Sequence, residues 1–465
     1  MNFDFKDKKI TVIGIGLHGG GVGVIKFLAG QGAKILATDL RSENELKESL
    51  GKLKELDVEY ILGQHRTEDF IKADLIIKNP GVPENSEFLM AAKNAGVAIE
   101  SDIGIFWELC PAEIIGVTGT KGKSTIATLI SEILKTNFPQ VILAGNIRAS
   151  VLEKLPEIFS QTEVVLELSS WQLADSKNHK KSPHIAVITN ILMDHLNRYD
   201  SLEDYISDKK VIFQSQKKDD FLILNFNDTY VKKMADEAIG QVYFYSTDNL
   251  LIKELNSNIK IGAYVENTKI YFGEERKEIC DVADIKLIGK HNLSDALAAI
   301  TVACLKNIPA EKIRIALQKF NGLEGRLQLI IEKDNVKYIN DTTATAPDAT
   351  IASLNALDDF SGSKKIILIS GGADKNLDFM EFSKAIKEKC KAVILLPGTA
   401  TQKIKDAIGN YTVKEAVDMK EAVESAKFLS EKGDIILLSP GCASFGLFRH
   451  EFERGEKFNE AVKNL

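Results

Sequence analysis

The sequence has 465 residues, enough at roughly 150 residues per domain for about three domains with a core each. Its 59 Lys and Arg residues against 66 Asp and Glu residues give a net charge of −7, which argues against nucleic acid or an anionic membrane as a partner. No apolar run approaches 18 residues and no signal-peptide pattern precedes the first apolar run, so we expect a cytoplasmic protein. The five scattered cysteines predict reduced, mostly buried thiols.

Short apolar runs alternate with helical patterns along the chain, which is typical of doubly wound parallel sheets. The runs are KITVIGIG, AKILATD, ADLIIKNPG, EIIGVTG, TEVVLELSS, HIAVITN and, late in the chain, KKIILISGG, KAVILLPG and DIILLSPG. We therefore predict three α/β domains, over residues 1–110, 111–322 and 323–465. Residues 255–287 instead predict short antiparallel strands added to the central sheet. No coiled-coil heptads or large apolar stripe calls for an oligomer, so we expect a monomer.

A glycine-rich turn follows the first predicted strand and opens a helix. It runs from Gly14 to Gly23, and Asp39 lies at the end of the next strand. Glycines let backbone amides approach phosphates, and an acidic side chain can bind a ribose hydroxyl. The turn predicts a cradle for a nucleotide or a UDP-sugar; a turn that only packs strand against helix is the alternative. Taken alone, it would also fit a dinucleotide-dependent oxidoreductase.

A second glycine-rich loop, Gly116–Thr125, lies between the strand EIIGV and a helix with one apolar face. Consecutive N–H groups and the helix N-terminus can surround phosphate oxygens there. Lys123 would reach the β and γ phosphates, and the hydroxyl of Ser124 or Thr125 would bind Mg²⁺. Val117 stands where the usual phosphate-loop pattern has its first glycine. The loop predicts ATP binding. The oxidoreductase hypothesis does not explain why this loop is present.

Three further polar groups are candidates for metal or phosphate chemistry. Glu167 ends the strand of VVLELSS, Asp194 and His195 follow AVITNILM, and Lys209 lies in YISDKK. Mg²⁺ takes few protein ligands and keeps several waters, so a carboxylate and an imidazole at strand ends could complete its shell. Each group alone has an ordinary alternative: a capping acid, a packed histidine and a solvated helix lysine.

Together these motifs resemble the Mur ligase family, and their order covers nearly the whole chain. The matches are Gly-x-Thr-Gly-Thr-x-Gly-Lys-Ser-Thr, Glu-Leu-Ser-Ser with Gln-Leu, Asp-His with Arg-Tyr, Gly289-Lys290-His291-Asn292, Asn340-Asp341 and Gly371-Gly372-Ala373-Asp374-Lys375. The resemblance implies a Rossmann-like UDP-sugar domain, a central P-loop ATPase domain and a Rossmann-like C-terminal domain for the amino acid. It also implies a reaction: ATP phosphorylates the carboxylate of UDP-N-acetylmuramoyl-L-alanine, and the amine of glutamate displaces the phosphate.

The resemblance further implies roles for individual residues. Expected at ATP are Gly119, Thr120, Lys121, Gly122, Lys123, Ser124, Thr125, Asn292, Asp295, Arg326 and Asp341. Expected at the UDP-sugar are Gly14, Ile15, Gly16, Leu17, Asp39, Arg41, Gly81, Asn146, Ser169 and His195. Expected at the amino acid are Thr343, Thr345, Asp374, Lys375, Ser444, Glu451 and Phe452. Lys123, Glu167, His195 and Lys209 are implied to be catalytic, and Ser124, Glu167, His195 and a carbamoylated Lys209 to hold one or two Mg²⁺ ions.

Three positions depart from the family pattern. Thr343 replaces a lysine expected to bind the incoming carboxylate, Glu451 stands in place of a phenylalanine with Phe452 displaced by one, and Asp295 replaces an asparagine. The first two fall in the amino-acid pocket, so they bear on the choice of amino acid. The resemblance implies D-glutamate as substrate, and L-glutamate is the alternative. A regulatory protein that binds ATP and a cell-wall precursor without joining anything, another Mur ligase, and a folylpolyglutamate synthase are the remaining hypotheses. The last lacks a Rossmann-like N-terminal domain.

Overall fold

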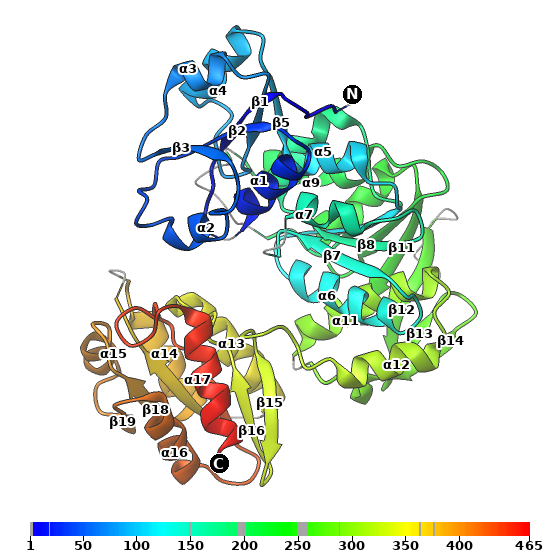
Figure 1. Ribbon diagram of the computed structural model, residues 1–465. Coiled ribbons are helices and arrows are strands. Elements are labelled where there is room, and N and C mark those ends of the chain that lie inside the picture. Colours follow the sequence, from blue (N-terminus) through cyan, green and yellow to red (C-terminus); the bar gives the residue numbers. More distant parts are fainter. Residues whose placement is uncertain are drawn as a thin grey trace. The chain divides into compact units, whose positions relative to one another are not determined.

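The computed structural model describes residues 3–17, 19–147, 150–192, 199, 201–248, 259–287, 289–361, 364–374 and 377–465. These residues form three sheets surrounded by helices (Figure 1). They divide into two compact units, the first of Met1–Asp281 with Ser294–Ala316 and the second of Val282–Leu293 with Leu317–Leu465. The predicted α/β fold is confirmed, and the first unit contains two of the three sheets.

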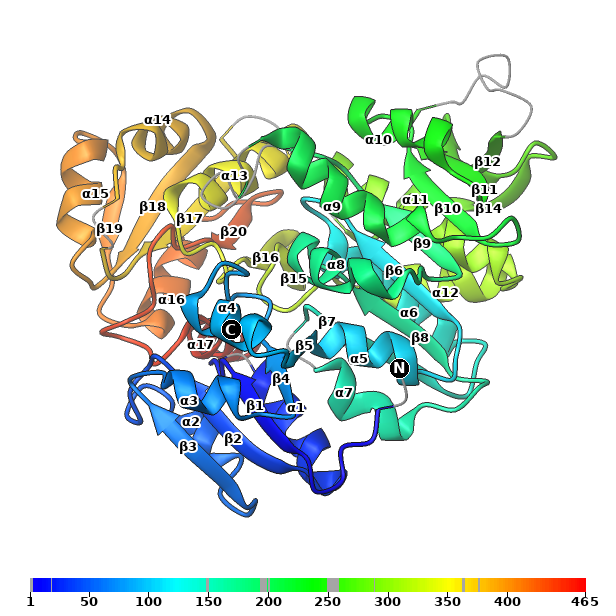
Figure 2. The same ribbon diagram turned by 90° about the horizontal axis from the view of Figure 1, so that it is seen from above.

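The first sheet is parallel, with the strand order β3-β2-β1-β4-β5 (Figure 2). Its strands are β1 (Lys9–Ile13), β2 (Lys34–Asp39), β3 (Val58–Leu62), β4 (Leu75–Lys78) and β5 (Ala98–Ser101). Its helices are α1 (Gly20–Gly30), α2 (Lys47–Gly51), α3 (Thr67–Ile71), α4 (Glu87–Asn94) and α5 (Asp102–Leu109). The winding reverses between β1 and β4, so the carboxyl ends of these two strands border a crevice.

The second sheet has nine strands in the order β14-β13-β12-β11-β10-β9-β6-β8-β7. They are β6 (Ile114–Thr118), β7 (Val141–Gly145), β8 (Glu163–Glu167), β9 (Ile185–Ile188), β10 (Phe221–Asn225), β11 (Gln241–Ser246), β12 (Ile259–Glu266), β13 (Lys269–Phe272) and β14 (Lys277–Asp281). β12, β13 and β14 pair antiparallel and extend the parallel part of the sheet through β11. This confirms the predicted antiparallel segment for residues 259–281; residues 255–258 lie outside the described residues.

Helices flank both faces of the second sheet. They are α6 (Lys123–Lys135), α7 (Val151–Lys154), α8 (Ser170–Ser176), α9 (Leu202–Gln214), α10 (Thr229–Lys233), α11 (Lys290–Leu305) and α12 (Ala310–Lys319), with 3₁₀ turns η1 (Leu155–Glu157), η2 (Lys177–His179) and η3 (Met234–Glu237). A further 3₁₀ turn, η5 (Val282–Asp284), is part of the second unit. The apolar residues of α6 that share one helical face, from Ile126 to Leu134, are buried as their spacing predicts.

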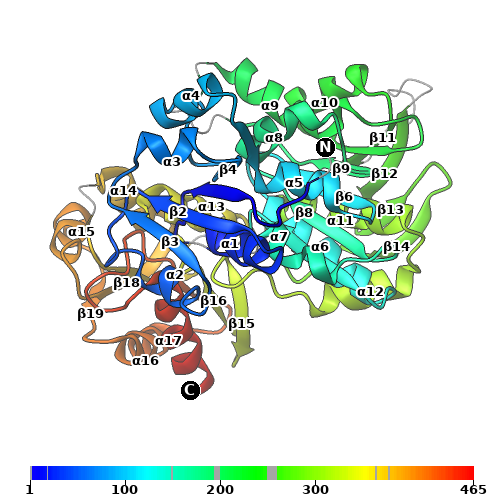
Figure 3. The same cartoon turned by 45° about the horizontal axis from the view of Figure 1, so that its top comes forward.

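One hydrophobic core connects the two sheets of the first unit. Phe27 of α1, Phe106 of α5 and Leu152 of α7 belong to the same buried cluster as Leu166 of β8. Because α7 contacts both α1 and α5, these three helices pack between the two sheets (Figure 3). The crevice of the first sheet is thereby held beside the second sheet.

The third sheet, in the second unit, has the order β15-β16-β20-β17-β18-β19. Its strands are β15 (Gln328–Lys333), β16 (Val336–Asn340), β17 (Ile366–Gly371), β18 (Cys390–Leu396), β19 (Val413–Glu415) and β20 (Ile435–Leu438). α13 (Pro347–Ser361), α14 (Met380–Lys389) and α15 (Thr401–Ile408) cover one face, and α16 (Met419–Leu429) and α17 (Glu451–Lys463) the other. Among the described strands of this sheet, β15 pairs antiparallel with β16, and the other neighbours pair parallel.

The cysteines agree with the prediction of reduced, mostly buried thiols. All five cysteines are free thiols, and Cys280, Cys390 and Cys442 are buried. Among the described residues, no helix combines the length and the apolar character that crossing a bilayer requires.

Candidate functional site

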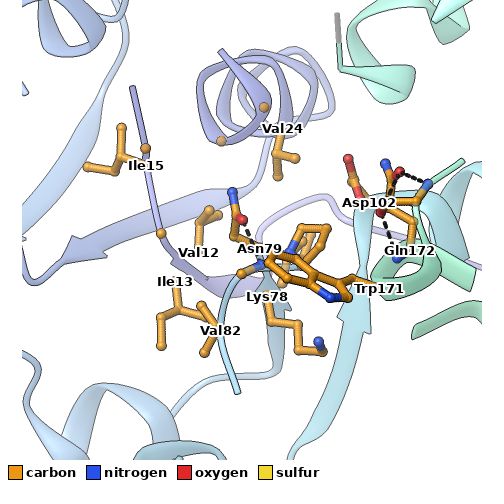
Figure 4. A pocket seen from close by; sticks show the side chains of 18 of the residues that line it. Val12, Ile13, Ile15, Val24, Lys78, Asn79, Val82, Asp102, Trp171 and Gln172 are labelled. Carbon is orange, nitrogen blue, oxygen red and sulfur yellow. Dashed lines mark hydrogen bonds between the residues drawn. The ribbon is translucent and has the colours of Figure 1, made fainter. Parts of the chain in front are cut away.

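A cavity of about 830 Å³ lies in the first unit, between the first sheet and the second. Figure 4 shows that Lys78, which ends β4, and Asn79, which follows it, line the cavity together with Trp171 and Gln172 of α8. The structure brings most of the residues predicted for the UDP-sugar to its wall: Gly14, Ile15, Gly16, Leu17, Asp39, Arg41, Gly81, Asn146 and Ser169. Lys123 and Lys209, predicted for the phosphate chemistry, line the same cavity. His195 lies outside the described residues.

The glycine turn after β1 is held open by backbone geometry that only glycine adopts readily. Gly14 and Gly16 have φ values of 92° and 69°, and a Cβ on Gly14 would lie 2.9 Å from Cβ of Asn79. The buried carboxylate of Asp39 accepts hydrogen bonds from the backbone N–H groups of Gly16 at 3.0 Å and Arg41 at 2.9 Å. Asp39 therefore holds the backbone of the glycine turn by hydrogen bonds, and it also lines the cavity.

The phosphate loop connects β6 to α6. Gly122, at φ 84°, is the N-cap of α6, so the unpaired N–H groups of the helix start here. The ammonium group of Lys123 donates a hydrogen bond to the carbonyl oxygen of Thr120 at 2.8 Å. A Cβ on Gly119 would lie 1.8 Å from Oγ1 of Thr189, because strand β9 ends against the loop. The loop thus has the compact backbone that an anion cradle requires.

Glu167 ends β8 and is 2% exposed. Its Oε1 accepts a hydrogen bond from Nδ2 of Asn146 at 3.0 Å. Its Oε2 is buried and has no hydrogen-bond partner among the described residues. A buried carboxylate oxygen without a hydrogen-bond donor is suited to act as a ligand of a cation, because burying it without any partner costs free energy.

Lys209 differs from the ordinary expectation of a solvated helix lysine. It lies within α9 rather than at a strand end, and it is 1% exposed. Its ammonium group donates to the carbonyl oxygen of Gly119 at 2.7 Å and lies 4.4 Å from the centre of the Tyr205 ring. The hydroxyl of Tyr205 is in turn 3.1 Å from Oγ1 of Thr120. Lys209 and Tyr205 therefore hold the backbone and side chains of the phosphate loop in place.

The sequence predicts that the strand end from Lys78 to Pro83 faces the same crevice as the glycine turn, and these residues line the cavity. The charged partners of Lys78 were not predicted. The buried ammonium group of Lys78, at the end of β4, pairs with Asp175 of α8 at 2.5 Å. Burial raises the pKa of Asp102, the first residue of α5, to about 6, although the charge of Lys78 opposes this. The partner of Lys78 lies 97 residues further along the chain, so no local pattern predicts this pair.

The other predicted ATP residues divide between the units. Asp295 of α11 lies in the first unit, where a Cβ on Gly122 would come within 2.3 Å of its Oδ1. Burial raises the pKa of Asp295 well above its ordinary value. Asn292, Arg326 and Asp341 lie in the second unit. Burial also raises the pKa of Asp341 to about 6, even though its carboxylate accepts hydrogen bonds from two serine hydroxyls.

The residues predicted for the amino acid gather at the carboxyl edge of the third sheet. Thr343 and Thr345 follow β16, Asp374 follows β17, and Ser444 follows β20. Glu451 and Phe452 open α17. Asp374 is already paired with Lys403, and Lys375 lies outside the described residues. Thr343, Thr345, Asp374 and Ser444 thus lie on loops at one edge of the third sheet, and Glu451 and Phe452 lie in the first turn of α17.

Comparison with known proteins identifies the chain's family. Three family models match successive segments: the Mur ligase MurD-like N-terminal domain over residues 8–101, the Mur ligase middle domain over 117–303 and the Mur ligase glutamate ligase domain over 325–442. The UDP-N-acetylmuramoylalanine–D-glutamate ligase of Roseiflexus sp. is 42% identical over 98% of this chain and 99% of its own length. The ligase of the same name from Acetivibrio thermocellus is 37% identical, covering 99% and 97%.

Solved structures show the same fold at lower identity. UDP-N-acetylmuramate–alanine ligase from Thermotoga maritima matches with a TM-score of 0.58 and 20% identity, covering 98% of this chain and 99% of that one. A MurF ligase from Thermotoga maritima in complex with ADP matches with a TM-score of 0.54 and 15% identity, covering 93% and 95%.

A phosphate loop beside a cavity shared with a Rossmann-like sheet, together with these matches, defines an ATP-dependent ligase that forms amide bonds. The chain belongs to the Mur ligase family, and its activity lies in the synthesis of peptidoglycan precursors.

Proposed function

We propose that the protein joins D-glutamate to UDP-N-acetylmuramoyl-L-alanine while converting ATP to ADP and phosphate. The observation that carries the proposal is that the glycine turn after β1 and Lys123 of the phosphate loop line the same cavity. Such a cavity suits a substrate bound by its nucleotide at one end and presenting an acid to ATP at the other. The names of the relatives, at 42% and 37% identity over nearly the full length, support the same substrates.

Activation of the acid explains the need for ATP. A carboxylate is a poor acyl donor, because its negative charge repels nucleophiles and oxide is a poor leaving group. In the proposed reaction a carboxylate oxygen of the alanine residue attacks the γ-phosphorus of ATP and ADP leaves. The amine of glutamate then attacks the carbonyl carbon of the acyl phosphate, loses a proton, and phosphate departs with that carboxylate oxygen. Each step concentrates negative charge, so catalysis depends on fixed positive charge in the site.

The residues of the first unit have corresponding proposed roles. Lys123 and the N–H groups from Gly119 to Thr125 would bind the phosphates of ATP. Asp39 and Arg41 would bind the uridine, the turn from Gly14 to Leu17 the diphosphate, and Gly81, Asn146, Ser169 and His195 the rest of the UDP-sugar. Lys123, Glu167, His195 and Lys209 are the proposed catalytic residues. Asn292, Asp295, Arg326 and Asp341 are the further proposed ATP-binding residues.

The amino acid is proposed to bind at the carboxyl edge of the third sheet. Thr343, Thr345, Asp374, Lys375, Ser444, Glu451 and Phe452 are the proposed contacts. Thr343 offers a hydroxyl and an N–H group in place of an ammonium charge, so recognition of the glutamate carboxylates would rest more on hydrogen bonds.

Mg²⁺ fits the described residues at Glu167, whose Oε2 is buried without a hydrogen-bond partner among them. No cluster of three acidic, histidine or cysteine side chains suited to a metal occurs in the described part of the chain, which does not include His195. Ser124, Glu167, His195 and Lys209 are the proposed ligands, for two ions. When bound, Mg²⁺ supplies charge neutralisation at the transferring phosphoryl group.

Carbamoylation of Lys209 is part of this proposal. The modification would replace a buried ammonium group beside Gly119 by a carbamate anion, which can ligate a cation. Its remaining N–H could still donate to the Gly119 carbonyl oxygen, the acceptor that Lys209 already contacts. The supporting observation is the burial of this lysine beside the phosphate loop.

We further propose that the protein acts as a cytoplasmic monomer, with domains over residues 1–110, 111–322 and 323–465. ATP and UDP-linked precursors are substrates of the cytoplasm, and size-exclusion chromatography with light scattering would measure the mass of the particle.

The proposed function is tested by measuring ADP and phosphate release with UDP-N-acetylmuramoyl-L-alanine and a panel of amino acids, followed by chiral analysis of the product. We expect release with D-glutamate, in a one-to-one ratio with the new amide. Preference for L-glutamate would overturn the choice of enantiomer. A lack of release with every amino acid would overturn ligase activity on this substrate and favour a regulatory role.

A further inference from the structure

A buried arginine of the second unit is bound by neutral groups. Arg454, in the first turns of α17, is 1% exposed. Its Nε donates to Oγ1 of Thr342 at 3.1 Å, one terminal nitrogen to the carbonyl oxygen of Thr342 at 2.8 Å, and the other to the carbonyl oxygen of Cys442 at 3.1 Å. No carboxylate of the described residues forms a salt bridge with it. Burying an arginine among neutral partners is costly, so the position calls for a specific reason.

The two peptide groups that Arg454 binds lead directly to other loops. The N–H of Thr343, in the peptide whose carbonyl Arg454 holds, donates to the carbonyl oxygen of Gly325 at 3.1 Å. The N–H of Ala443, in the other such peptide, donates to the carbonyl oxygen of Ala373 at 3.2 Å. A charged donor on the carbonyl polarises the peptide and strengthens the hydrogen bond at its N–H.

Four loops at the carboxyl edge of the third sheet are therefore linked through one guanidinium group. They are the loop before β15, the loop after β16, the loop after β17 and the loop after β20. A further bond, from the N–H of Gly441 to the carbonyl oxygen of Ala344, connects the second and fourth directly at 2.9 Å. These loops carry Thr343, Thr345, Asp374 and Ser444, the proposed contacts of the amino acid.

The start of α17 is built to hold the arginine in place. Oγ1 of Thr342 donates to the carbonyl oxygen of Glu451 at 2.6 Å, and Nδ2 of Asn340 donates to that of Gly455 at 3.2 Å. A Cβ on Gly455 would lie 2.7 Å from Cγ2 of Thr342, so glycine allows the helix to approach the end of β16 closely. Figure 1 shows α17, in red, beside β16.

We propose that Arg454 is a positioning residue that sets the geometry of the amino-acid pocket by fixing the peptide groups of Thr342 and Cys442. The inference rests on the proposed function, because it assumes that glutamate binds at these loops. Burial lowers the pKa of Arg454 only to about 10, so the side chain remains a cation at neutral pH. Arg454 acts through the loops that it holds and need not touch the substrate.

The test compares Arg454→Lys and Arg454→Met with the wild type and with Arg449→Met. Lysine keeps the charge but loses the planar fork, methionine removes both, and Arg449 is a control with a side chain that is 81% exposed. The KM for glutamate, ATP and the UDP-linked acid is measured for each protein, together with the thermal unfolding midpoint.

We expect Arg454→Lys to raise the KM for glutamate by on the order of tenfold, with the other two KM values within about twofold and Arg449→Met unchanged. Arg454→Met should be worse than Arg454→Lys. If Arg454→Met does not fold, Arg454→Lys decides the question. Unchanged KM values with a lower kcat, or an equal rise in all three, would show a purely structural role and overturn the proposal.

A second readout separates this inference from the proposed function. Absence of turnover by the wild type would overturn the function, and amide hydrogen exchange would then decide the role of Arg454. Arg454→Lys is expected to speed exchange in residues 341–346, 371–374 and 440–444 but not in the phosphate loop. Unchanged exchange in these segments would contradict the linkage.

Discussion

The ammonium group of Lys209 donates a hydrogen bond to the carbonyl oxygen of Gly119 at 2.7 Å. A side chain from the middle of α9 thus holds Gly119, a glycine of the phosphate loop that Lys209 was predicted to serve. The contact makes the position of the loop depend on this lysine, whether or not the amine is modified.

Replacement of Lys209 is expected to abolish most of the turnover. Lys209→Met removes the bond to Gly119 and the proposed carbamate, and kcat should fall roughly 10²–10³-fold. After incubation with ¹³C-bicarbonate, the wild type should show a carbamate carbon signal that Lys209→Met lacks. Lys210→Met is the control, because its neighbouring ammonium group pairs with Glu237 at the surface. Equal signals in wild type and Lys209→Met would rule out carbamoylation of this residue.

Gly122→Ala should damage nucleotide binding through the backbone. Gly122 has a φ of 84°, and the new Cβ would come within 2.3 Å of Oδ1 of Asp295. We expect a loss of stability of about 1–3 kcal/mol and a clear rise in the dissociation constant of ATP. Gly30→Ala is the matched control: its Cβ meets nothing within 4 Å, and in a helix it should stabilise by roughly 0.5–1 kcal/mol. Calorimetric ATP binding and thermal unfolding measure both effects, and unaltered binding by Gly122→Ala would refute the assigned loop geometry.

Asp39→Ala should weaken binding of the UDP-linked acid selectively. The substitution removes the acceptor for the N–H groups of Gly16 and Arg41, so the glycine turn loses its support. The KM for the UDP-linked acid should rise roughly ten- to a hundredfold, with the KM for ATP nearly constant. Asp74→Ala is the control, because Asp74 accepts from the N–H of Lys9 at the opposite end of β1. A parallel rise of both KM values in Asp39→Ala would argue against the assigned role.

Asp102 should make the stability of the protein depend on pH. Its pKa is raised from 3.8 to about 6 by burial, so the folded state holds this proton more tightly than the unfolded state. The resulting stability is complete below about pH 4 and is lost as the pH rises through about 6. Asp102→Asn should therefore be more stable than the wild type at pH 7.5, by up to about 3 kcal/mol, and gain nothing at pH 4. Urea unfolding at the two pH values measures the difference, and an equal gain at both would exclude ionisation as its cause.

Local patterns were sufficient to predict the most apolar strands of each sheet, the two glycine-rich loops and the apolar face of α6. These features depend on residues close in sequence, and strand ends of a parallel sheet meet at one edge. The shorter or more polar strands, among them β3, β7 and β19, were not predicted. The hairpin of β15 and β16 was not predicted. Its turn consists of Asp334 and Asn335, which both have the positive φ values that a two-residue hairpin turn requires.

Burial of charged residues was harder to predict from the sequence. Lys209 and Lys210 are adjacent, yet only Lys209 has apolar residues both three and four positions away on each side, namely Tyr205, Ile206, Ile212 and Phe213. The corresponding neighbours of Lys210 include Ser207 and Gln214. That spacing could have identified it. The pairing of Lys78 with Asp175 and the approach of Asp295 to Gly122 join distant segments, so no local pattern encodes them.

The account is tested most directly by following oxygen from the acid to phosphate. UDP-N-acetylmuramoyl-L-alanine labelled with ¹⁸O in its carboxylate is incubated with ATP, Mg²⁺ and D-glutamate, and the inorganic phosphate is analysed by mass spectrometry. Attack of the carboxylate on ATP predicts one ¹⁸O atom in each phosphate released. Phosphate that carries no label, released together with the amide, would contradict activation of the acid by phosphorylation.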